Sequence, residues 1–226
     1  MKKTIWCLKA FLLAVTITAL FSQCAVIDKI RGKKAEDGNA AELMSDGIEK
    51  MNRGRFKDAA ADFQQIKDRY PYSKYAIQAE LKMADALYIQ EAYDLAFDAY
   101  TEFEKLHPKN KEIPYVIFRR GLCQFDQVKS FDRDQGRMLR AKEEFERLIR
   151  LFPEDAYGQR AQQYLRECLI SLSKYELYVG HFYFKKGKYQ AALDRYLYVV
   201  NTYPDMGQYQ EALEYISLCK QKISEE

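Results

Sequence analysis

The amino-acid sequence predicts an all-α protein built as an array of helix pairs. Glycine and proline are scarce, at 10 and 5 of 226 residues, good helix formers are abundant, and no alternating run of β-branched residues indicates a strand. Proline recurs at one kind of joint, directly after an aromatic ring, and a proline ends a helix. A small residue and a ring also recur at fixed distances before these prolines, which are Pro71, Pro108, Pro153 and Pro204.

Residues 1–23 predict a signal peptide. Lys2 and Lys3 give a positively charged start, and Ala10 to Phe21 form an apolar core of 12 residues. That core is shorter than the ~20 residues that a membrane-spanning helix needs. Removing this leader with its three lysines leaves 33 basic and 33 acidic residues. A nucleic-acid partner, which needs a concentrated basic face, is therefore not expected.

The stretch from Leu20 to Cys24 (LFSQC) resembles a bacterial lipobox, although Phe21 and Gln23 depart from its pattern. The resemblance implies that the leader is cut before Cys24, that Cys24 carries the lipid, and that Ala25 directs the lipoprotein to the outer membrane. Ordinary cleavage nearby or an uncleaved anchor are the alternatives. Residues 24–39 contain two glycines and mixed charges, and we expect a flexible tether between the lipid and the fold.

Counting back from the prolines reveals the repeat. An alanine stands twelve residues before each proline and a ring four residues after that alanine, so both lie on one helical face. A second small residue further upstream would let two antiparallel helices approach closely, with the ring filling the gap. This pattern resembles the tetratricopeptide repeat and implies a solenoid over residues 40–226. The alanines are Ala59, Ala96, Ala141 and Ala192, the rings Phe63, Tyr100, Phe145 and Tyr196, and the second small residues Gly47, Ala84, Gly121 and Gly180.

Two repeats depart from a regular spacing, and each departure predicts an element. The third repeat has 8 extra residues within Phe125 to Arg140, which predict a loop. The fourth has a surplus of 14 residues, close to four helical turns, and no proline or glycine interrupts Gln159 to Val179. We therefore expect one elongated helix near 157–186. After Pro204 a single helix, about Gln208 to Ile223, would cap the four helix pairs.

The first helix of each pair lines the concave side of a tetratricopeptide solenoid. Positions assigned from the prolines make that side apolar, and a large exposed apolar patch usually marks a binding surface. For each of these side chains, packing against a neighbouring helix stays open as the alternative. The predicted groove residues are Met44, Ile48, Met51, Leu81, Tyr88, Tyr115, Phe118, Leu122 and Phe125.

Several stretches are more specific than the generic repeat. They are Arg69-Tyr70-Pro71-Tyr72, the run from Tyr115 to Leu122, Asp132-Arg133-Asp134 in the insertion, and Tyr175 to Val179 leading to Gly187 to Arg195. In order and spacing these stretches resemble the BamD family of lipoproteins from the outer-membrane β-barrel assembly machinery, from about residue 40 to the end. That family is usually counted as five repeats, whereas four and a cap are found here, and the loop is shorter.

The resemblance implies a non-enzymatic scaffold, anchored by lipid to the periplasmic face of the outer membrane. It implies that residues 40–110 receive unfolded barrel precursors, whose extended segments an apolar groove could hold, and that residues 111–226 join the periplasmic domains of the barrel protein BamA. Arg195 falls at the family's arginine in the last repeat, where an acidic group on BamA is the expected mate. A plain surface ion pair, which would contribute little, is the alternative.

An enzyme is a different class of function, and no residue pattern supports it. The two histidines, His107 and His181, pair with no nucleophile, and the chain has no phosphate loop or zinc set, so no catalytic residue, metal or cofactor is predicted. Carboxylates such as Glu143 and Glu144 are expected to be solvated. A repeat lipoprotein that coordinates cell-wall synthesis or polysaccharide export is the nearer alternative. Buried free thiols, rather than one disulfide, are expected at Cys123, Cys168 and Cys219.

Overall fold

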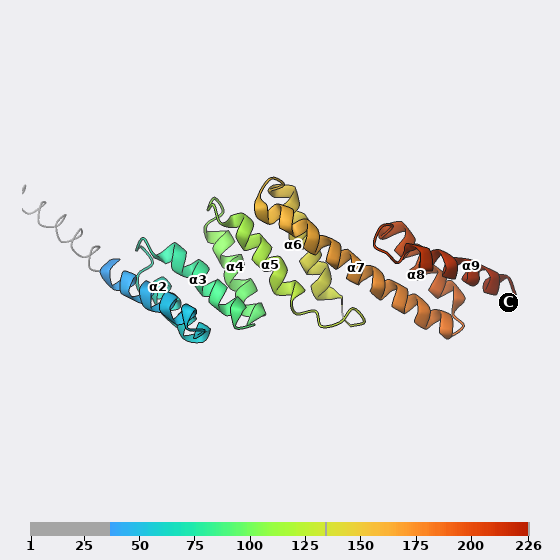
Figure 1. Cartoon of the computed structure of the whole chain (residues 1–226), viewed down its shortest axis with the longest axis horizontal. Coiled ribbons are helices and arrows are strands. Elements are labelled where there is room, and N and C mark those ends of the chain that lie inside the picture. Colours follow the sequence, from blue (N-terminus) through green and yellow to red (C-terminus); the bar gives the residue numbers. More distant parts are fainter. Residues whose placement is uncertain (1–36, 134, 226) are drawn as a thin grey trace, which may run out of the picture. The chain divides into compact units, whose positions relative to one another are not determined.

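The computed structural model describes residues 37–133 and 135–225, and every regular element among them is a helix (Figure 1). The predicted signal peptide and the predicted lipidation site Cys24 lie outside the described residues, while 37–39, expected to belong to the tether, are already helical. A helix that occupies 37–52 is followed by α2 (Phe56–Arg69), α3 (Ala76–Ile89), α4 (Tyr93–Leu106), α5 (Ile113–Phe125), α6 (Gly136–Leu151), α7 (Ala156–Lys185), α8 (Tyr189–Thr202) and α9 (Tyr209–Glu225). The predicted all-α fold, with four pairs and a final helix in the described range, is confirmed.

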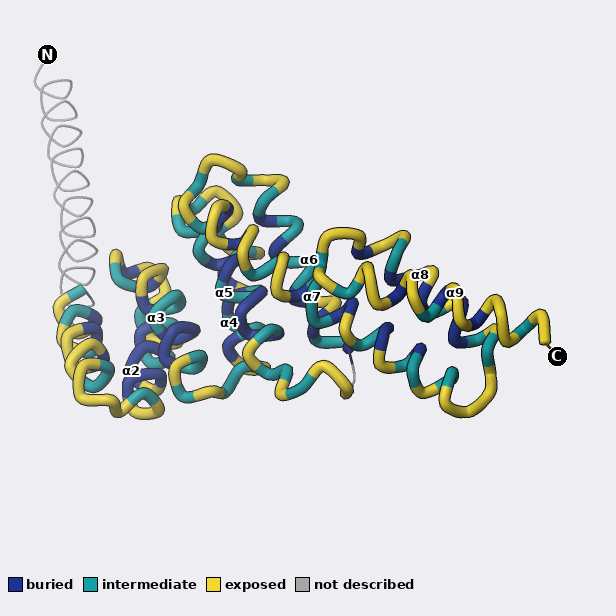
Figure 2. Tube along the Cα trace, turned by 45° about the vertical axis from the view of Figure 1, so that its right-hand side comes forward, coloured by how far each residue is buried: buried dark blue, intermediate teal, exposed yellow. Residues whose placement is uncertain are grey.

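The chain divides into two compact units, which are described separately. The first reaches Ala86 and the second begins at Leu87, so the boundary lies within α3. In the second unit, each helix from α4 to α9 packs against the next one along the chain, and α5 also contacts α7. Figure 2 shows buried positions concentrated along α5, which has nine of them, whereas α9 is mostly exposed. The predicted division of roles at residue 110 concerns partners and stays a prediction.

The four recurring prolines follow helix ends of one geometry. The residue before each proline is the C-cap, with φ between −127° and −137° and ψ between 50° and 59°. Its backbone N–H donates to the carbonyl of the apolar residue four positions earlier, which keeps one orphan carbonyl of the last turn bonded. The prediction that these prolines mark helix ends is confirmed at each of the caps, Tyr70, His107, Phe152 and Tyr203.

The repeated small residues allow the rings to pack directly against a helix backbone. A Cβ added to Gly47, Gly121 or Gly180 would lie 2.5 to 2.6 Å from the ring Cε1 atom of the same repeat. The rings concerned, Phe63, Phe145 and Tyr196, are fully buried. This contact is the one that the sequence pattern predicted, and it holds the two helices of a pair together.

The elongated helix α7 runs over 30 residues, within one residue of the predicted bounds. The Asp155 carboxylate caps its start by accepting the Tyr157 N–H, and Gly187, with φ +71°, follows its end. The inserted loop is shorter than the predicted Phe125 to Arg140, since α6 already begins at Gly136. Helix α9 buries Ala212, Ile216 and Cys219 in a cluster with α7 and α8, as expected for a capping helix.

Gly158, in the first turn of α7, is a position that admits no side chain. A Cβ added there would lie 2.1 Å from the Phe152 carbonyl oxygen, which is backbone and cannot rotate away. Helix propensity alone would make alanine more stable than glycine by about 1 kcal/mol. We expect Gly158→Ala instead to lower the free energy of unfolding by about 2 kcal/mol or more, measured by chemical denaturation.

Gly38→Ala is the matched control for this change. Gly38 is also helical, but nothing lies within 4 Å of an added Cβ, so its replacement should be neutral or stabilising. A Gly158→Ala variant more stable than the parent chain would show that the backbone contact with Phe152 is wrong.

Candidate partner-binding site

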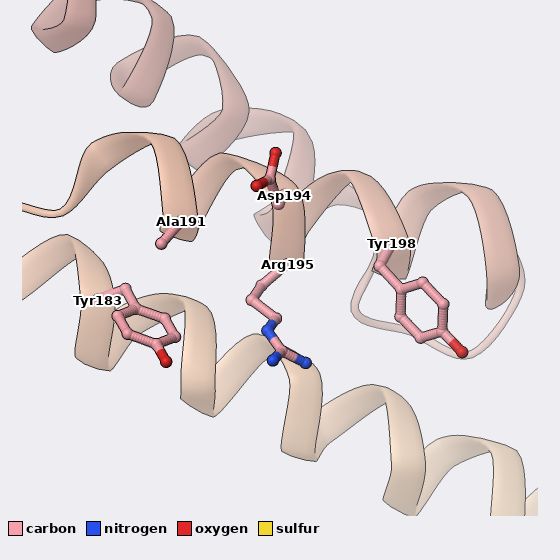
Figure 3. Close-up of a pocket in the computed structure, with 5 residues that line it drawn as sticks. All are labelled: Tyr183, Ala191, Asp194, Arg195 and Tyr198. Carbon is pink, nitrogen blue, oxygen red and sulfur yellow. The ribbon is translucent and has the colours of Figure 1, made fainter.

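Arg195 projects from α8 toward α7 (Figure 3). Its Nη1 donates a hydrogen bond of 2.8 Å to Oε2 of Glu176 on α7, and this bond raises the pKa of Arg195. The Arg195 side chain is 43% exposed, whereas Glu176 is only 15% exposed. The arginine therefore has a carboxylate mate within the chain and keeps part of its guanidinium open to solvent.

A pocket of about 340 Å³ lies beside this arginine. Asp194 is engaged by the Gln190 amide, which donates to its Oδ1 at 3.1 Å. Tyr198 is exposed and contacts the Tyr203 ring edge to face. The pocket thus combines rings with one partly open guanidinium, and its lining residues are Tyr183, Ala191, Asp194, Arg195 and Tyr198 (Figure 3).

Arg195 occupies a position that carries an ion pair in other repeats as well. The residue directly before the ring is charged in three of the four repeats, and each time it pairs with an opposite charge on the first helix of the same pair. The second repeat has Ala99 at this position. Repeats one and three place the carboxylate on the second helix, whereas repeat four reverses the polarity. The pairs are Asp62–Lys50, Glu144–Arg120 and Arg195–Glu176.

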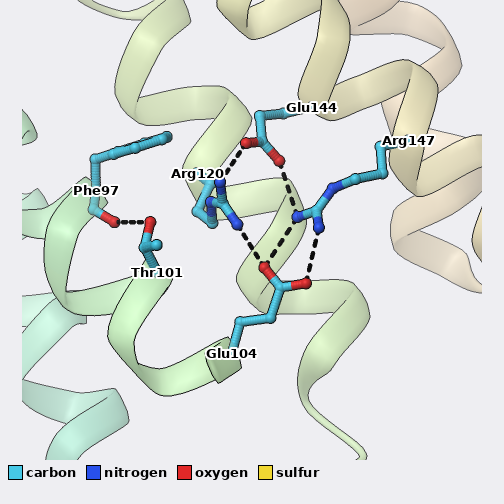
Figure 4. Close-up of polar contacts among 6 residues, drawn as sticks. All are labelled: Phe97, Thr101, Glu104, Arg120, Glu144 and Arg147. Atoms are coloured by element: carbon cyan, nitrogen blue, oxygen red, sulfur yellow. Dashed lines mark hydrogen bonds and ion pairs between the residues drawn. The ribbon is translucent and has the colours of Figure 1, made fainter. Parts of the chain in front are cut away.

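A four-residue ion network connects α4, α5 and α6 (Figure 4). Arg120 lies between the carboxylates of Glu104 and Glu144, and Arg147 forms a two-pronged pair with Glu104 at 2.8 and 2.9 Å. The expectation that Glu144 is solvated was wrong, because its side chain is only 12% exposed and burial raises its pKa. Glu144 precedes the ring Phe145, so a charge at that position was the sequence signal that could have revealed the network.

In the first unit, the predicted groove residues differ in exposure. Ile48 is 39% exposed, and Met51 and Leu81 are half-buried. The prediction was wrong for Met44, which is buried in the core of this unit. Position 44 lies one turn before Gly47 on the same helical face, so it is drawn into the packing that the glycine permits.

Tyr88 begins the groove set of the second unit and is held from two sides. The Arg119 guanidinium lies 3.7 Å from the centre of the Tyr88 ring, and the Tyr88 hydroxyl donates a hydrogen bond to the Asp126 carboxylate. Burial, together with this hydrogen bond, raises the pKa of Tyr88. The tyrosine is half-buried, so one part of it remains accessible.

The groove residues predicted on α5 fill the core instead of lining an open surface. Phe118 is 2% exposed, with the rings of Phe145, Tyr157 and Tyr164 at 5.4 to 5.9 Å. The prediction was wrong for Phe118 and for Leu122, which are both buried. The reason is that the first turns of α7 carry Tyr157 and Tyr164 across this face of α5. Half-buried Tyr115 and Phe125 also contact these rings, at 5.3 Å each.

The histidines and cysteines take part in packing. His181 contacts the Tyr196 hydroxyl through Nδ1 and Glu211 through Nε2, which connects α7, α8 and α9. The three described cysteines, Cys123, Cys168 and Cys219, are buried free thiols as predicted, and burial raises the pKa of Cys123 and Cys168 to about 12. Among residues 37–133 and 135–225 no cluster of histidine, cysteine or carboxylate groups could hold a metal ion.

These features define the class of protein as an all-helical repeat protein with a partly open arginine beside a pocket. The family model "YfiO: Outer membrane lipoprotein" matches residues 36–226, and the chain belongs to that family. None of the helices described here is both long and apolar enough to span a membrane.

Curated relatives carry the name outer membrane protein assembly factor BamD. The chain is 27% identical to the one from Neisseria meningitidis serogroup A, over 96% of this chain and 85% of the relative. It is 30% identical to the one from Rickettsia prowazekii, over 83% and 77%, and 25% identical to the one from Vibrio cholerae, over 77% and 76%. These relatives support an assembly factor rather than an enzyme, and favour this role over cell-wall synthesis or polysaccharide export.

Two solved structures share a general likeness with the chain. The first TPR of Spaghetti (RPAP3) bound to an HSP90 peptide is 20% identical, with a TM-score of 0.44, over 58% of this chain and 91% of that one. The MamA RS-1 ArsTM double mutant is 14% identical, with a TM-score of 0.46, over 83% and 98%. Because both scores lie below 0.5, we base no conclusion on them.

Proposed function

We propose that the chain is a non-enzymatic scaffold that brings outer-membrane barrel precursors to a BamA-type barrel protein. A lipid on Cys24 anchors it to the periplasmic face of the outer membrane. The second unit binds the periplasmic domains of the barrel protein around Arg195, and apolar side chains nearer the amino terminus bind the precursor. Membership of a family of outer membrane lipoproteins, with assembly factors as relatives, supports this role.

The observation that carries the barrel-protein contact is the partly open guanidinium beside a pocket. Arginine has five N–H donors, and the bond to Glu176 uses one of them. The remaining N–H groups can donate hydrogen bonds to a carboxylate of a partner. Tyr183 and Tyr198 flank that edge with apolar surface. Arginine and tyrosine are enriched among the residues that dominate binding energy at protein interfaces.

Exchanging the charges of Arg195 and Glu176 distinguishes a direct contact of Arg195 with the partner from a role in the internal ion pair alone. We expect Arg195→Glu to weaken binding of the periplasmic domains of the barrel protein by about 30-fold or more, since losing one member of a close charge pair costs at least about 2 kcal/mol. The double variant Glu176→Arg with Arg195→Glu restores the internal pair but not the partner's contact. Its thermal stability should therefore recover while its affinity, measured by calorimetric titration, stays low.

Glu176→Gln is the control, because it breaks the internal pair and leaves Arg195 in place, so binding should persist. If the exchanged double variant binds the barrel protein as tightly as the parent chain, Arg195 acts only through Glu176 and the proposed contact is wrong.

For the precursor we propose the apolar residues that remain accessible in the first unit. Ile48 is exposed, as are Ile77 and Tyr72, and Met51 and Leu81 are half-buried. Met44, Phe118 and Leu122 are buried and take no part in this site. An extended segment with alternating apolar side chains would dock on such a surface without nucleotide or metal.

We expect Ile48→Ser to weaken binding of a barrel-derived carboxy-terminal peptide about tenfold, because burying an isoleucine side chain contributes about 1.5 kcal/mol or more. The readout is fluorescence anisotropy of the labelled peptide. Ile89→Ser is the matched control, since Ile89 is the same residue type, is 43% exposed against 39% for Ile48, and is not among the proposed residues. An equal loss of affinity in both variants would count against a site at Ile48.

A further inference from the structure

One face of α7 is exposed, aromatic and basic. Exposed side chains recur along it at spacings of four and three residues, which places them in one stripe. Tyr178 and Phe182 are 49% and 53% exposed, and the Lys186 ammonium lies 5.9 Å from the centre of the Phe182 ring. The stripe consists of Lys174, Tyr178, Phe182, Lys185 and Lys186, and we call it the α7 face.

The inserted loop extends this face. Phe131, at the exposed part of the loop, contacts Tyr178 edge to face with 6.3 Å between ring centres. Lys129 and Arg133 of the same loop are exposed. The Asp132 carboxylate between them accepts a hydrogen bond from the Ser130 hydroxyl. Together the stripe and the loop supply three exposed aromatic rings and five cationic side chains.

The α7 face carries more positive than negative charge. Between Cys168 and Lys185 the helix carries a single carboxylate, Glu176, which points to the opposite side and pairs with Arg195. The other carboxylate of α7, Glu167, precedes Lys174 by seven residues, so no carboxylate lies within the stripe itself. A surface with this charge attracts an anionic partner, and the exposed rings require that partner to offer an apolar layer as well.

We propose that the α7 face and Phe131 dock on a bilayer surface that bears anionic phosphate headgroups. Lysine ammonium groups bind such headgroups while their stems lie along apolar surface, and Tyr and Phe rings enter the boundary between headgroups and acyl chains. The stripe covers the last 12 residues of α7 and its C-cap Lys186, about 18 Å at 1.5 Å per residue, and such an extended row fits a flat partner.

An anchored protein needs only weak affinity for such a surface. The lipid on Cys24, which belongs to the proposed function, would keep the chain close to a bilayer, and this raises the effective concentration of headgroups at the α7 face. Docking would then set the orientation of the second unit at the membrane. The face itself is a feature of residues 129–133 and 174–186 and does not depend on the anchor.

The test uses the chain from residue 24 onward with Cys24→Ser, so that no lipid contributes. Every contact described above lies within residues 37–225 and is retained. The only tryptophan, Trp6, is absent from this chain, so Phe182→Trp introduces a single reporter on the face. We expect its emission to shift to the blue with vesicles of phosphatidylcholine and phosphatidylglycerol, and to stay unchanged with phosphatidylcholine alone. Leu151→Trp, at a position 54% exposed on α6, should show no shift.

Lysine variants test whether the cations of the α7 face bind the headgroups, measured by sedimentation with the same anionic vesicles. Replacing Lys174, Lys185 and Lys186 by glutamine should weaken binding about a hundredfold, at about fivefold for each lysine. The matched control replaces three exposed lysines elsewhere in the second unit, Lys105, Lys109 and Lys111, and should bind like the parent chain. Circular dichroism confirms that all variants are folded.

Three results would overturn the proposal. The first is no emission shift with anionic vesicles, and the second is equal loss of binding in the two lysine series. The third is a shift with an acidic aromatic peptide but not with vesicles, which would assign the face to a protein partner. Because the barrel protein is absent from these assays, their failure leaves the proposed contact at Arg195 unaffected.

Discussion

Replacing Phe118 by alanine should lower the free energy of unfolding by about 3–5 kcal/mol, although Phe118 was first predicted to line a peptide groove. The ring is buried among Phe145, Tyr157 and Tyr164, and the Arg160 guanidinium lies 5.0 Å from its centre. Removing it leaves a cavity between α5 and α7, and the loss of a buried aromatic side chain has a cost of this size. Chemical denaturation followed by circular dichroism measures the change.

Phe182→Ala is the control, since Phe182 lies in the same unit and is 53% exposed, so its loss should change stability by no more than about 0.5 kcal/mol. A Phe118→Ala variant that is as stable as the parent chain but binds a barrel-derived peptide poorly would restore the original groove hypothesis.

Replacing Arg120 by methionine should cost about 3 kcal/mol. Arg120 is 14% exposed and pairs with both Glu104 and Glu144, so its removal leaves Arg147 alone with two carboxylates that face little solvent. Breaking a buried ion pair by removing one partner is strongly destabilising because a charge stays uncompensated. Burial already raises the pKa of Glu144 above its unfolded value, so the loss should be largest at neutral pH and shrink as the pH falls and Glu144 is protonated.

The double variant Arg120→Met with Glu144→Gln tests this account of the network. It leaves the two-pronged Arg147–Glu104 pair with equal and opposite charges, so most of the lost stability should return. Lys142→Met, which breaks a more exposed pair with Glu146, should change stability by no more than about 0.5 kcal/mol. If the double variant is less stable than Arg120→Met, charge balance is not the reason for the loss.

The repeat itself was predictable from the sequence because it depends on local chemistry. A proline cannot continue a helix beyond its first turn, so the caps at Tyr70, His107, Phe152 and Tyr203 followed from the prolines after them. The fifth proline, Pro114, lies in the first turn of α5, where proline is tolerated. The approach of Gly121 to Phe145 followed equally from residue size and helical spacing. The elongated helix α7 followed from the surplus of 14 residues and from the absence of proline and glycine between Gln159 and Val179.

The exposure of the site residues could not be predicted in the same way. Spacing shows that Phe118 faces a neighbouring helix. Whether that helix carries Tyr157 or a small residue at the contact depends on how a segment 39 residues later packs against α5. Ion pairs such as Arg195–Glu176 also join positions 19 residues apart, and only the packed structure shows which charges meet. A single sequence therefore predicted the scaffold well and its accessible surface only in part.

The reversed charge order in the fourth repeat has a consequence for how the chain folds. If the second helix of repeat three docked by mistake on the first helix of repeat four, Glu144 would approach Glu176, and the opposite exchange would bring Arg195 toward Arg120. Like charges at a partly buried contact repel, so these mismatched assemblies are penalised while the correct ones are favoured. Two neighbouring helix pairs that share the same packing positions are thereby kept from exchanging partners during folding.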